Sequence, residues 1–137
     1  MSSIFQVKKV IFKDLKEHIK SKCTFSVDVK MRKVDELKDT PLVLFSEERN
    51  ESFNRTTNYQ NQDRLINYEI NIYCKGKDCE QKIDDLSILV VEVMENKYHM
   101  EGGLLSVIPY FDDNEPYTLQ ANFRYTTRYS PSRLLIY

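Results

Sequence analysis

The sequence contains few of the residues that build flexible linkers or disulfide frameworks. Its 137 residues include only three glycines and four prolines, which argues against a fibrous or linker-rich chain. Three cysteines are an odd number and a poor disulfide framework, so we expect the thiols to stay reduced. No apolar run is long enough to form a transmembrane helix. The first residues also lack the apolar core of a signal peptide, which predicts a protein that stays in the cytoplasm where it is made.

The overall charge is almost balanced. The chain has 20 basic and 21 acidic side chains, which gives a net charge of −1. This balance excludes a protein that binds nucleic acid through bulk positive charge. With 41% hydrophobic residues, the length suits one domain over residues 1–137 with a core of normal size.

The charges are unevenly distributed along the chain. Residues 1–38 carry ten basic and five acidic side chains, whereas residues 78–101 carry seven acidic and two basic ones. The segment 117–137 has three arginines and no acid. A molecule with one basic and one acidic side can stack head to tail around a ring, although ordinary charge scatter is the alternative explanation.

Hydrophobic periodicity predicts two helices. Apolar residues at steps of three and four indicate a helix over residues 3–21 and another over residues 79–97. Asp78 and Gln81 have the spacing of an N-cap and its reciprocal partner. The pair Gly102-Gly103 is expected to reverse the chain after the second helix.

Alternating apolar and polar residues predict the strands. The candidate strands are residues 25–31, 41–45, 66–74, 105–111 and 117–129. The predicted fold class is therefore α+β, a two-layer sandwich with a mostly antiparallel sheet of about four or five strands and two helices packed on one face. The last strand is long enough to bend or to project, and the apolar end at 133–137 is either tucked into the domain or held by a neighbour.

A polar segment interrupts the pattern at residues 46–64. Its 19 residues hold four Asn and two Gln but only two large apolar groups, Phe53 and Tyr59. The sequence predicts a long polar loop here, and the alternative is an extended hairpin that orders against a partner.

No arrangement typical of an active site is present in the sequence. Three glycines cannot form a phosphate-binding loop. The spacing of Cys74 and Cys79 from the two histidines does not match the usual zinc motifs, and Asp84 and Asp85 would point about 100° apart on a helix. We therefore expect no enzyme, no catalytic residue, no metal and no cofactor.

One enzymatic alternative stays open. Asp28 and Lys30, two residues apart on a strand, could belong to a small magnesium-dependent nuclease in which a carboxylate holds the metal and the lysine neutralises developing charge. Such a site needs more acids nearby, for which Asp112 and Asp113 are available, although they have the pattern of a turn.

The order of elements resembles a known family. A leading helix, two strands and a polar segment precede the strand Asn67–Tyr73 and the helix around residues 83–94, and two strands close the chain. This layout resembles the small tail-terminator and head–tail joining proteins of tailed bacteriophages, the lambda-like tail terminator among them. The resemblance covers nearly the whole chain but is one of order and size, without a signature motif.

The resemblance implies a structural role in the virion. Members of that family form rings, commonly hexameric, that cap the tail tube and join it to the head connector. It implies assembly in the host cytoplasm, a place in the tail or neck, and partners among tube, connector and neck proteins, with no membrane and no sequence-specific nucleic acid. A minor capsid or head-completion protein is the closest alternative. The candidate interface residues are Arg49, Asn54, Arg55, Tyr59, Arg124, Arg128, Arg133, Leu135 and Tyr137.

Overall fold

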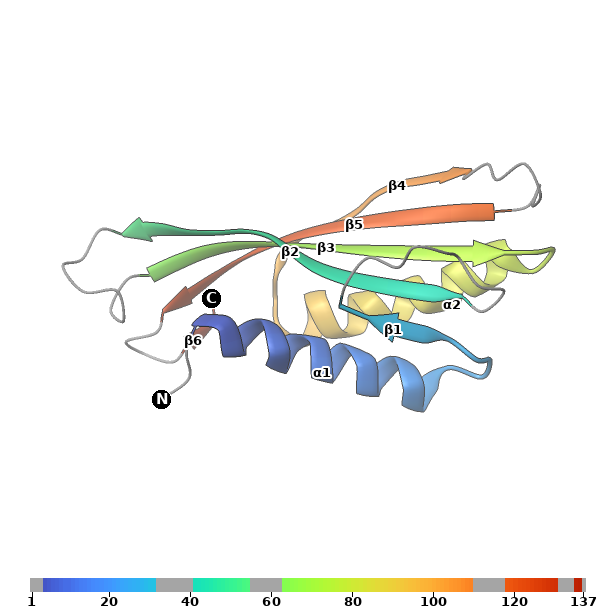
Figure 1. Ribbon diagram of the computed structural model, residues 1–137, viewed down its shortest axis with the longest axis horizontal. Helices are drawn as coiled ribbons and strands as arrows, with labels where there is room; N and C mark the ends of the chain where they lie inside the picture. The colour runs from blue at the N-terminus through green and yellow to red at the C-terminus, as the bar shows by residue number, and fades with distance from the viewer. Residues whose placement is uncertain (1–3, 32–40, 55–62, 110–117, 131–134, 137) are drawn as a thin grey trace.

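Two helices cover one side of a curved, mixed sheet (Figure 1). The computed structural model describes residues 4–31, 41–54, 63–109, 118–130 and 135–136. Its elements are α1 (Ile4–Lys22), β1 (Asp28–Lys30), β2 (Leu42–Asn54), β3 (Asp63–Lys75), α2 (Cys79–Val91), the π-helical η2 (Glu92–Lys97), β4 (Glu101–Pro109), β5 (Thr118–Ser130) and β6 (Leu135–Ile136). The predicted α+β sandwich is confirmed.

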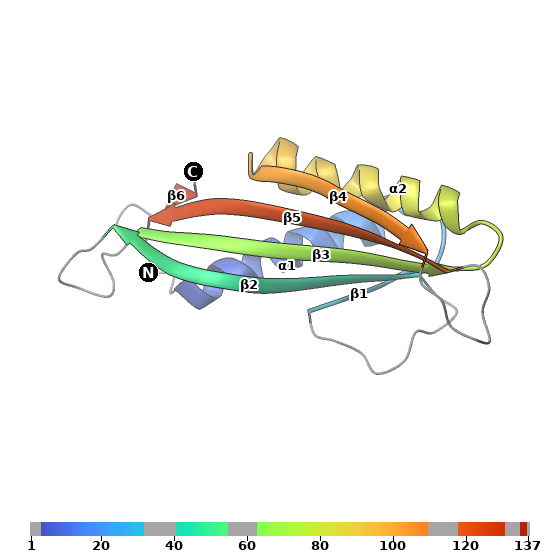
Figure 2. The same ribbon diagram turned by 90° about the horizontal axis from the view of Figure 1, so that it is seen from above.

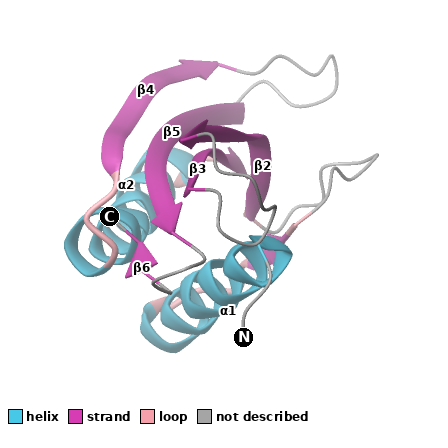
Figure 3. Ribbon diagram, turned by 90° about the vertical axis from the view of Figure 1, so that its left-hand side faces the viewer, coloured by secondary structure: helices cyan, strands magenta, loops and turns pink. Residues whose placement is uncertain are grey.

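The sheet has the order β1-β2-β3-β5-β4, and the two-residue β6 pairs with the end of β5. β1 runs parallel to β2, and the other pairs are antiparallel. Viewed from one end, the sheet arches over the helices, with β2 and β4 on opposite sides of the arch (Figure 3). β1 and β4 are therefore the two edges of the main sheet, and they lie on opposite sides of the molecule.

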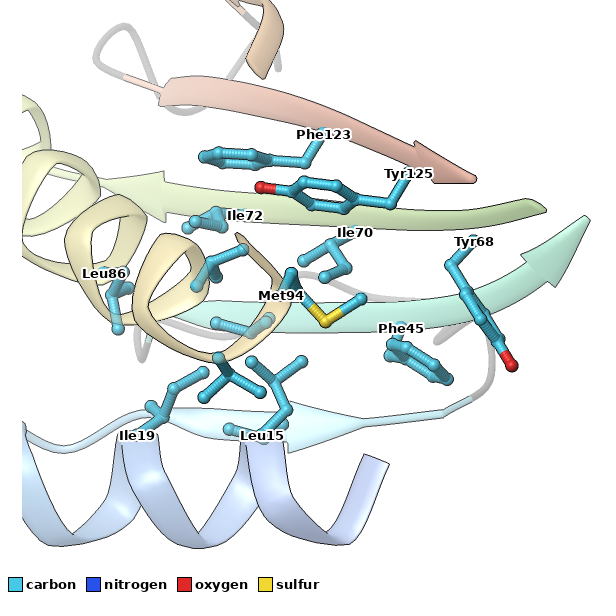
Figure 4. Close-up of a cluster of buried hydrophobic side chains, with 14 of the residues drawn as sticks. Leu15, Ile19, Phe45, Tyr68, Ile70, Ile72, Leu86, Met94, Phe123 and Tyr125 are labelled. Atoms are coloured by element: carbon cyan, nitrogen blue, oxygen red, sulfur yellow. The ribbon is translucent and has the colours of Figure 1, made fainter. Parts of the chain in front are cut away.

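The core lies between the helices and the concave side of the sheet. The apolar stripe of α1 is buried as predicted at Val7, Ile11, Leu15 and Ile19. α2 and η2 form one continuous helical segment over 79–97, which matches the predicted helix. Figure 4 shows Leu86 and Met94 of this segment facing the buried side chains of the sheet. None of the helices in the described residues is long and apolar enough to cross a membrane.

The prediction of a cap at the start of α2 is wrong. Asp78 occupies the N-cap position but makes no side-chain capping bond. The Gln81 side chain instead donates to the Asp85 carboxylate, with an Nε2–Oδ1 distance of 2.9 Å, four residues further along the helix. The i,i+4 pairing on the helix surface has taken the place of the reciprocal cap.

The predicted polar loop at 46–64 is also wrong, because most of it is strand. β2 and β3 each have 13 residues and pair as far as Asn54 with Asp63, whereas residues 55–62 lie outside the described residues. Main-chain pairing satisfies the backbone whatever the polarity of the side chains. Arg64 of β3 also joins the two strands, which we call the β2–β3 ribbon. Its Nε donates to Asn50 Oδ1 at 2.7 Å and its Nη2 to the Asn50 main-chain oxygen at 2.6 Å. The paired strands at 46–54 and 63–64 agree with the extended-hairpin alternative, and its ordering against a partner stays a prediction.

The chain reversal after the second helix does not lie at the glycine pair. It lies at Tyr98–Met100, where His99 has a φ of 54°, and Gly102 and Gly103 are already part of β4. An ideal Cβ on Gly102 would stand 2.1 Å from the backbone oxygen of Arg124. The glycine is needed because β4 approaches β5 closely, and not because the chain turns there.

β5 is the long strand that the alternation predicts. Ala121, Phe123, Tyr125 and Thr127 are buried, and the strand pairs with β3 from residue 118 to residue 129. β6 then pairs with the end of β5 in the same chain, through Leu135–Ser130 and Ile136–Tyr129. The apolar end was predicted either to fold onto its own domain or to be held by a neighbour. At residues 135–136 it folds onto its own domain.

Candidate assembly surfaces

β4 is an exposed apolar edge strand. Seven of its nine residues are exposed. Among the described residues, four of the six large hydrophobic side chains that stay exposed belong to it, at 47–60% exposure: Leu104, Leu105, Val107 and Ile108. Exposed apolar side chains gathered on one edge strand mark an interaction site more often than scattered single residues do.

A bulge determines where these side chains point. Leu104 pairs with Phe123 and Val107 with Ala121, with a register shift between Leu104 and Ser106. Paired residues share a face of the sheet, so both Leu104 and Val107 lie on the face that carries the buried Phe123 and Ala121. In a regular strand, two residues three positions apart would lie on opposite faces.

The bulge and α2 together form a groove, the α2–β4 groove, with a volume of about 500 Å³. Figure 2 shows β4 running alongside α2 at one side of the molecule. The apolar residues lining it are Ile83, Leu104, Val107 and Leu119, and the polar ones are Glu80, Gln81, Asp84 and Ser87. The groove therefore combines hydrocarbon surface with two carboxylates.

The opposite charge lies on α1. Lys9, Lys13, Lys16 and Lys20 are exposed and fall on the side of the helix opposite to its buried stripe. We refer to these four residues as the lysine stripe. Beside it, Val10 is 53% exposed. The unequal charge distribution in the sequence thus corresponds to two different surfaces of the fold.

Polar contacts join the two helices at the level of η2. Asp14 of α1 accepts from Lys97 Nζ at 2.8 Å and from the Tyr98 hydroxyl, and His18 lies 2.5 Å from Glu92, measured between Nε2 and Oε2. Burial raises the pKa of Asp14, but the bonds from Lys97 and Tyr98 outweigh burial and hold the pKa below its ordinary value. These contacts orient α1 so that its lysine stripe faces away from α2.

The convex face of the sheet carries a polar network. The Asn122 amide donates to Glu69 Oε1 and to Asn71 Oδ1 at 2.9 and 2.6 Å, and Gln120 donates to Asn71 at 3.1 Å. A hydrogen bond between Glu48 and Glu69 raises the pKa of Glu48 and lowers that of Glu69. The network gives this face a fixed pattern of amide and carboxyl groups.

Three of the predicted interface residues lie on this convex face. Arg124 pairs in register with Glu69, and its Nε is 3.9 Å from Glu69 Oε2. Arg49 on β2 lies in the next row, opposite Asn67, and Arg128 on β5 lies one row further, opposite Leu65; both arginines are exposed. The structure thus brings together arginines that are separated by up to 79 positions in the sequence.

The other predicted interface residues are not placed as a group. Asn54 is the last residue of β2, and Leu135 begins β6. Arg55, Tyr59, Arg133 and Tyr137 lie outside the described residues.

The structure describes some of the residues considered for metal chemistry. Asp28 and Lys30 are both half-buried on β1, while Asp112 and Asp113 lie outside the described residues. Cys74 and Cys79 are buried free thiols, and burial raises the pKa of Cys74 to about 11. Within the described ranges, no three or more His, Cys, Asp or Glu side chains group in a way that could hold a metal ion.

Sequence reasoning missed the α2–β4 groove. A regular strand over residues 105–111 puts Leu105 and Val107 on the same face, whereas the bulge puts Leu104 and Val107 on the same face, opposite Phe123 and Ala121 of β5. The available signal was the two adjacent apolar pairs, Leu104-Leu105 and Val107-Ile108, which simple alternation does not produce.

Comparison of the sequence with protein-family models and with curated proteins finds no match.

Proposed function

We propose that this chain is a structural protein of the tail-terminator type, which assembles into a ring, caps a phage tail tube and joins it to the head connector. The proposed location is the tail or neck of a virion assembled in the host cytoplasm. The proposed partners are further copies of the chain, the tube protein and the connector.

The observation that carries the proposal is the pairing of an apolar, acidic edge with a basic side on one small fold. β4 leaves four large hydrophobic side chains exposed, which is costly for a lone monomer and useful in an assembly. The lysine stripe on α1 and the carboxylates beside β4 have opposite charges on different surfaces. A molecule with two different complementary surfaces forms head-to-tail contacts, and these close into a ring when the rotation between copies permits.

The long β2–β3 ribbon supports the second half of the proposal, contact with the tube. It continues beyond the region where the strands cover α2, with Arg64 and Asn50 bracing it (Figure 1). Of the arginines on the convex face, Arg124 lies at the middle of the sheet, and Arg49 and Arg128 lie towards the end formed by Asn54 and Asp63. Within the chain, Arg49 already pairs with Glu51 (Nε–Oε1 3.4 Å) and Arg124 with Glu69 (Nε–Oε2 3.9 Å). Guanidinium groups can bind carboxylates with two parallel hydrogen bonds, so the carboxylates of an acidic tube surface would compete with these exposed pairs.

The test combines the purified protein with polymerising tail-tube protein and uses electron microscopy to measure tube length and the structure of the tube ends. The proposal predicts rings in solution, a ring at one end of each tube and a narrow distribution of tube lengths. A protein that stays monomeric and leaves tube length unchanged would contradict it. Recovery of the protein on tailless heads, and not on tails, would instead favour the head-completion alternative.

A further inference from the structure

We propose that the α2–β4 groove receives the lysine-bearing face of α1 from a second copy of this chain. The inference rests on the proposed self-assembly and identifies the two surfaces that meet. Val10 and the neighbouring lysines of one copy would enter the groove of the next, so that each copy offers one α1 face and one groove.

The groove matches this occupant in its chemistry. Leu104 and Val107 supply an apolar surface, and Glu80 and Asp84 supply two negative charges from one helix. On α1, the exposed Val10 lies one turn before Lys13, at the border of the lysine stripe, and Lys13 also pairs with Glu17 at an Nζ–Oε1 distance of 4.0 Å. The exposed Val10 and the exposed floor of the groove would each gain from being removed from water.

Charge also excludes the simplest alternative, a symmetric contact of groove with groove. Such a contact would bring Glu80 and Asp84 of both copies together around a two-fold axis. Like charges at a close interface oppose association, whereas the carboxylates of a groove and the lysine stripe attract each other. The contact is therefore heterologous, which is the type that a ring requires.

The form of β4 favours a helix over an added strand as the occupant. A strand that continued the sheet would need a regular ladder along the outer edge of β4. The bulge between Leu104 and Ser106 and the proline at 109 both interrupt such a ladder. The contact therefore depends on side chains, which a helix face such as α1 can provide.

The test is charge reversal on each surface, followed by mixing. The groove variant carries Glu80→Lys and Asp84→Lys, and the helix variant carries Lys9→Glu and Lys13→Glu. Each variant alone brings like charges together at every contact, so we expect at least a tenfold weaker association than for the wild type, measured by analytical ultracentrifugation. In a mixture, each variant is complementary to the other at both contacts, so we expect assembly to return, with the two variants alternating.

Matched controls separate this contact from general charge effects. Asp78→Lys with Asp85→Lys makes the same change in net charge on the opposite side of α2, and we expect it to assemble like the wild type. Leu104→Ser with Val107→Ser removes the apolar floor without changing charge, and we expect weaker assembly at a temperature at which circular dichroism shows both this variant and the wild type to be folded. Wild-type assembly should also weaken as salt is raised.

Two results would overturn the proposal: single variants that assemble like the wild type, or a mixture that does not assemble. Tube-length measurements on the same samples separate this proposal from the proposed function. If both single variants still form rings and cap tubes, the function stands and the assigned contact is wrong. If the mixture assembles through paired charges but tubes grow without limit, the contact stands and the tail-terminator function is wrong. A wild type that is monomeric at every concentration contradicts both.

Discussion

Replacement of Gly102 by alanine tests whether β4 is held against β5 as closely as the structure indicates. The new Cβ would stand 2.1 Å from the Arg124 carbonyl oxygen and 3.0 Å from the Tyr125 Cα, and both atoms belong to the backbone. Neither can rotate away, so the strands must separate by about 1 Å to reach ordinary contact. The change also places an L-residue at a φ of +129°, which glycine tolerates and alanine does not.

The size of the effect follows from these two contributions. The unfavourable φ costs about 1–2 kcal/mol. Separation of the strands weakens about two main-chain hydrogen bonds, each worth about 1 kcal/mol net. We therefore expect Gly102→Ala to lower the free energy of unfolding by about 3–4 kcal/mol, which corresponds to a fall in Tm of roughly 10–15 °C for a chain of this length.

Gly103→Ala is the matched control, because Gly103 also has a positive φ, of +153°. A Cβ there would meet only the Glu95 carboxylate, at 3.9 Å. We expect this variant to lose only the backbone contribution, about 1–2 kcal/mol. Urea unfolding followed by circular dichroism measures both variants. If the two variants lost equal amounts of unfolding free energy, or if Gly102→Ala lost none, the close approach of β4 to β5 would be refuted.

Three further predictions concern the core, the helix junction and the convex face. Leu86→Ala should lower the free energy of unfolding by about 2–5 kcal/mol in chemical denaturation, because the side chain is fully buried and its loss leaves a cavity; a loss below 1 kcal/mol would mean that α2 is not packed on the sheet. The folded state lowers the pKa of Asp14, so this group contributes stability above its unfolded pKa, which is lost as the pH falls through the lower folded value. Unfolding measured between about pH 5 and pH 2 should therefore depend less steeply on pH in Asp14→Asn than in the wild type, and identical slopes would contradict the Lys97–Tyr98–Asp14 contact. Finally, Arg49→Glu combined with Arg128→Glu should leave self-assembly intact but weaken binding to tail tubes in a co-sedimentation assay; unchanged tube binding would remove the convex face from the proposed contact.

Most of the fold could be predicted because periodicity reports which side chains are buried. The steps of three and four in α1 and the alternation in β5 both follow from the geometry of a helix or strand with one face in the core. Burial of Ile11, Leu15, Phe123 and Tyr125 fulfils that expectation. The same reasoning fails where neither face is buried. The segment 46–54 is polar apart from Phe53, so its sequence carries no alternation, although its backbone pairs with β3, with register shifts between Glu47 and Arg49 and between Ser52 and Asn54.

The errors at β4 have a different cause. A bulge breaks the two-residue period, so the sequence pattern could not assign Leu104 and Val107 to the same face. Gly102 and Gly103 were expected to form a turn because glycine is common in turns, but contact with β5, which is distant in sequence, is what requires a glycine at 102. The candidate site was predicted only in part for the same reason. Arg49 and Arg124 come onto the same face, in adjacent rows on either side of β3, through the register of β2, β3 and β5, and no local pattern encodes that register.

The central claim is that this chain works by joining copies of itself and capping a tube, and imaging of tube ends tests it most directly. Purified protein is added to growing tail tubes, and cryo-electron microscopy records the ends and the lengths. The account predicts a closed ring of this chain seated at one end of each tube, with elongation stopped at that end. The account would be contradicted if both tube ends were bare, the tubes kept growing and the protein remained monomeric in solution.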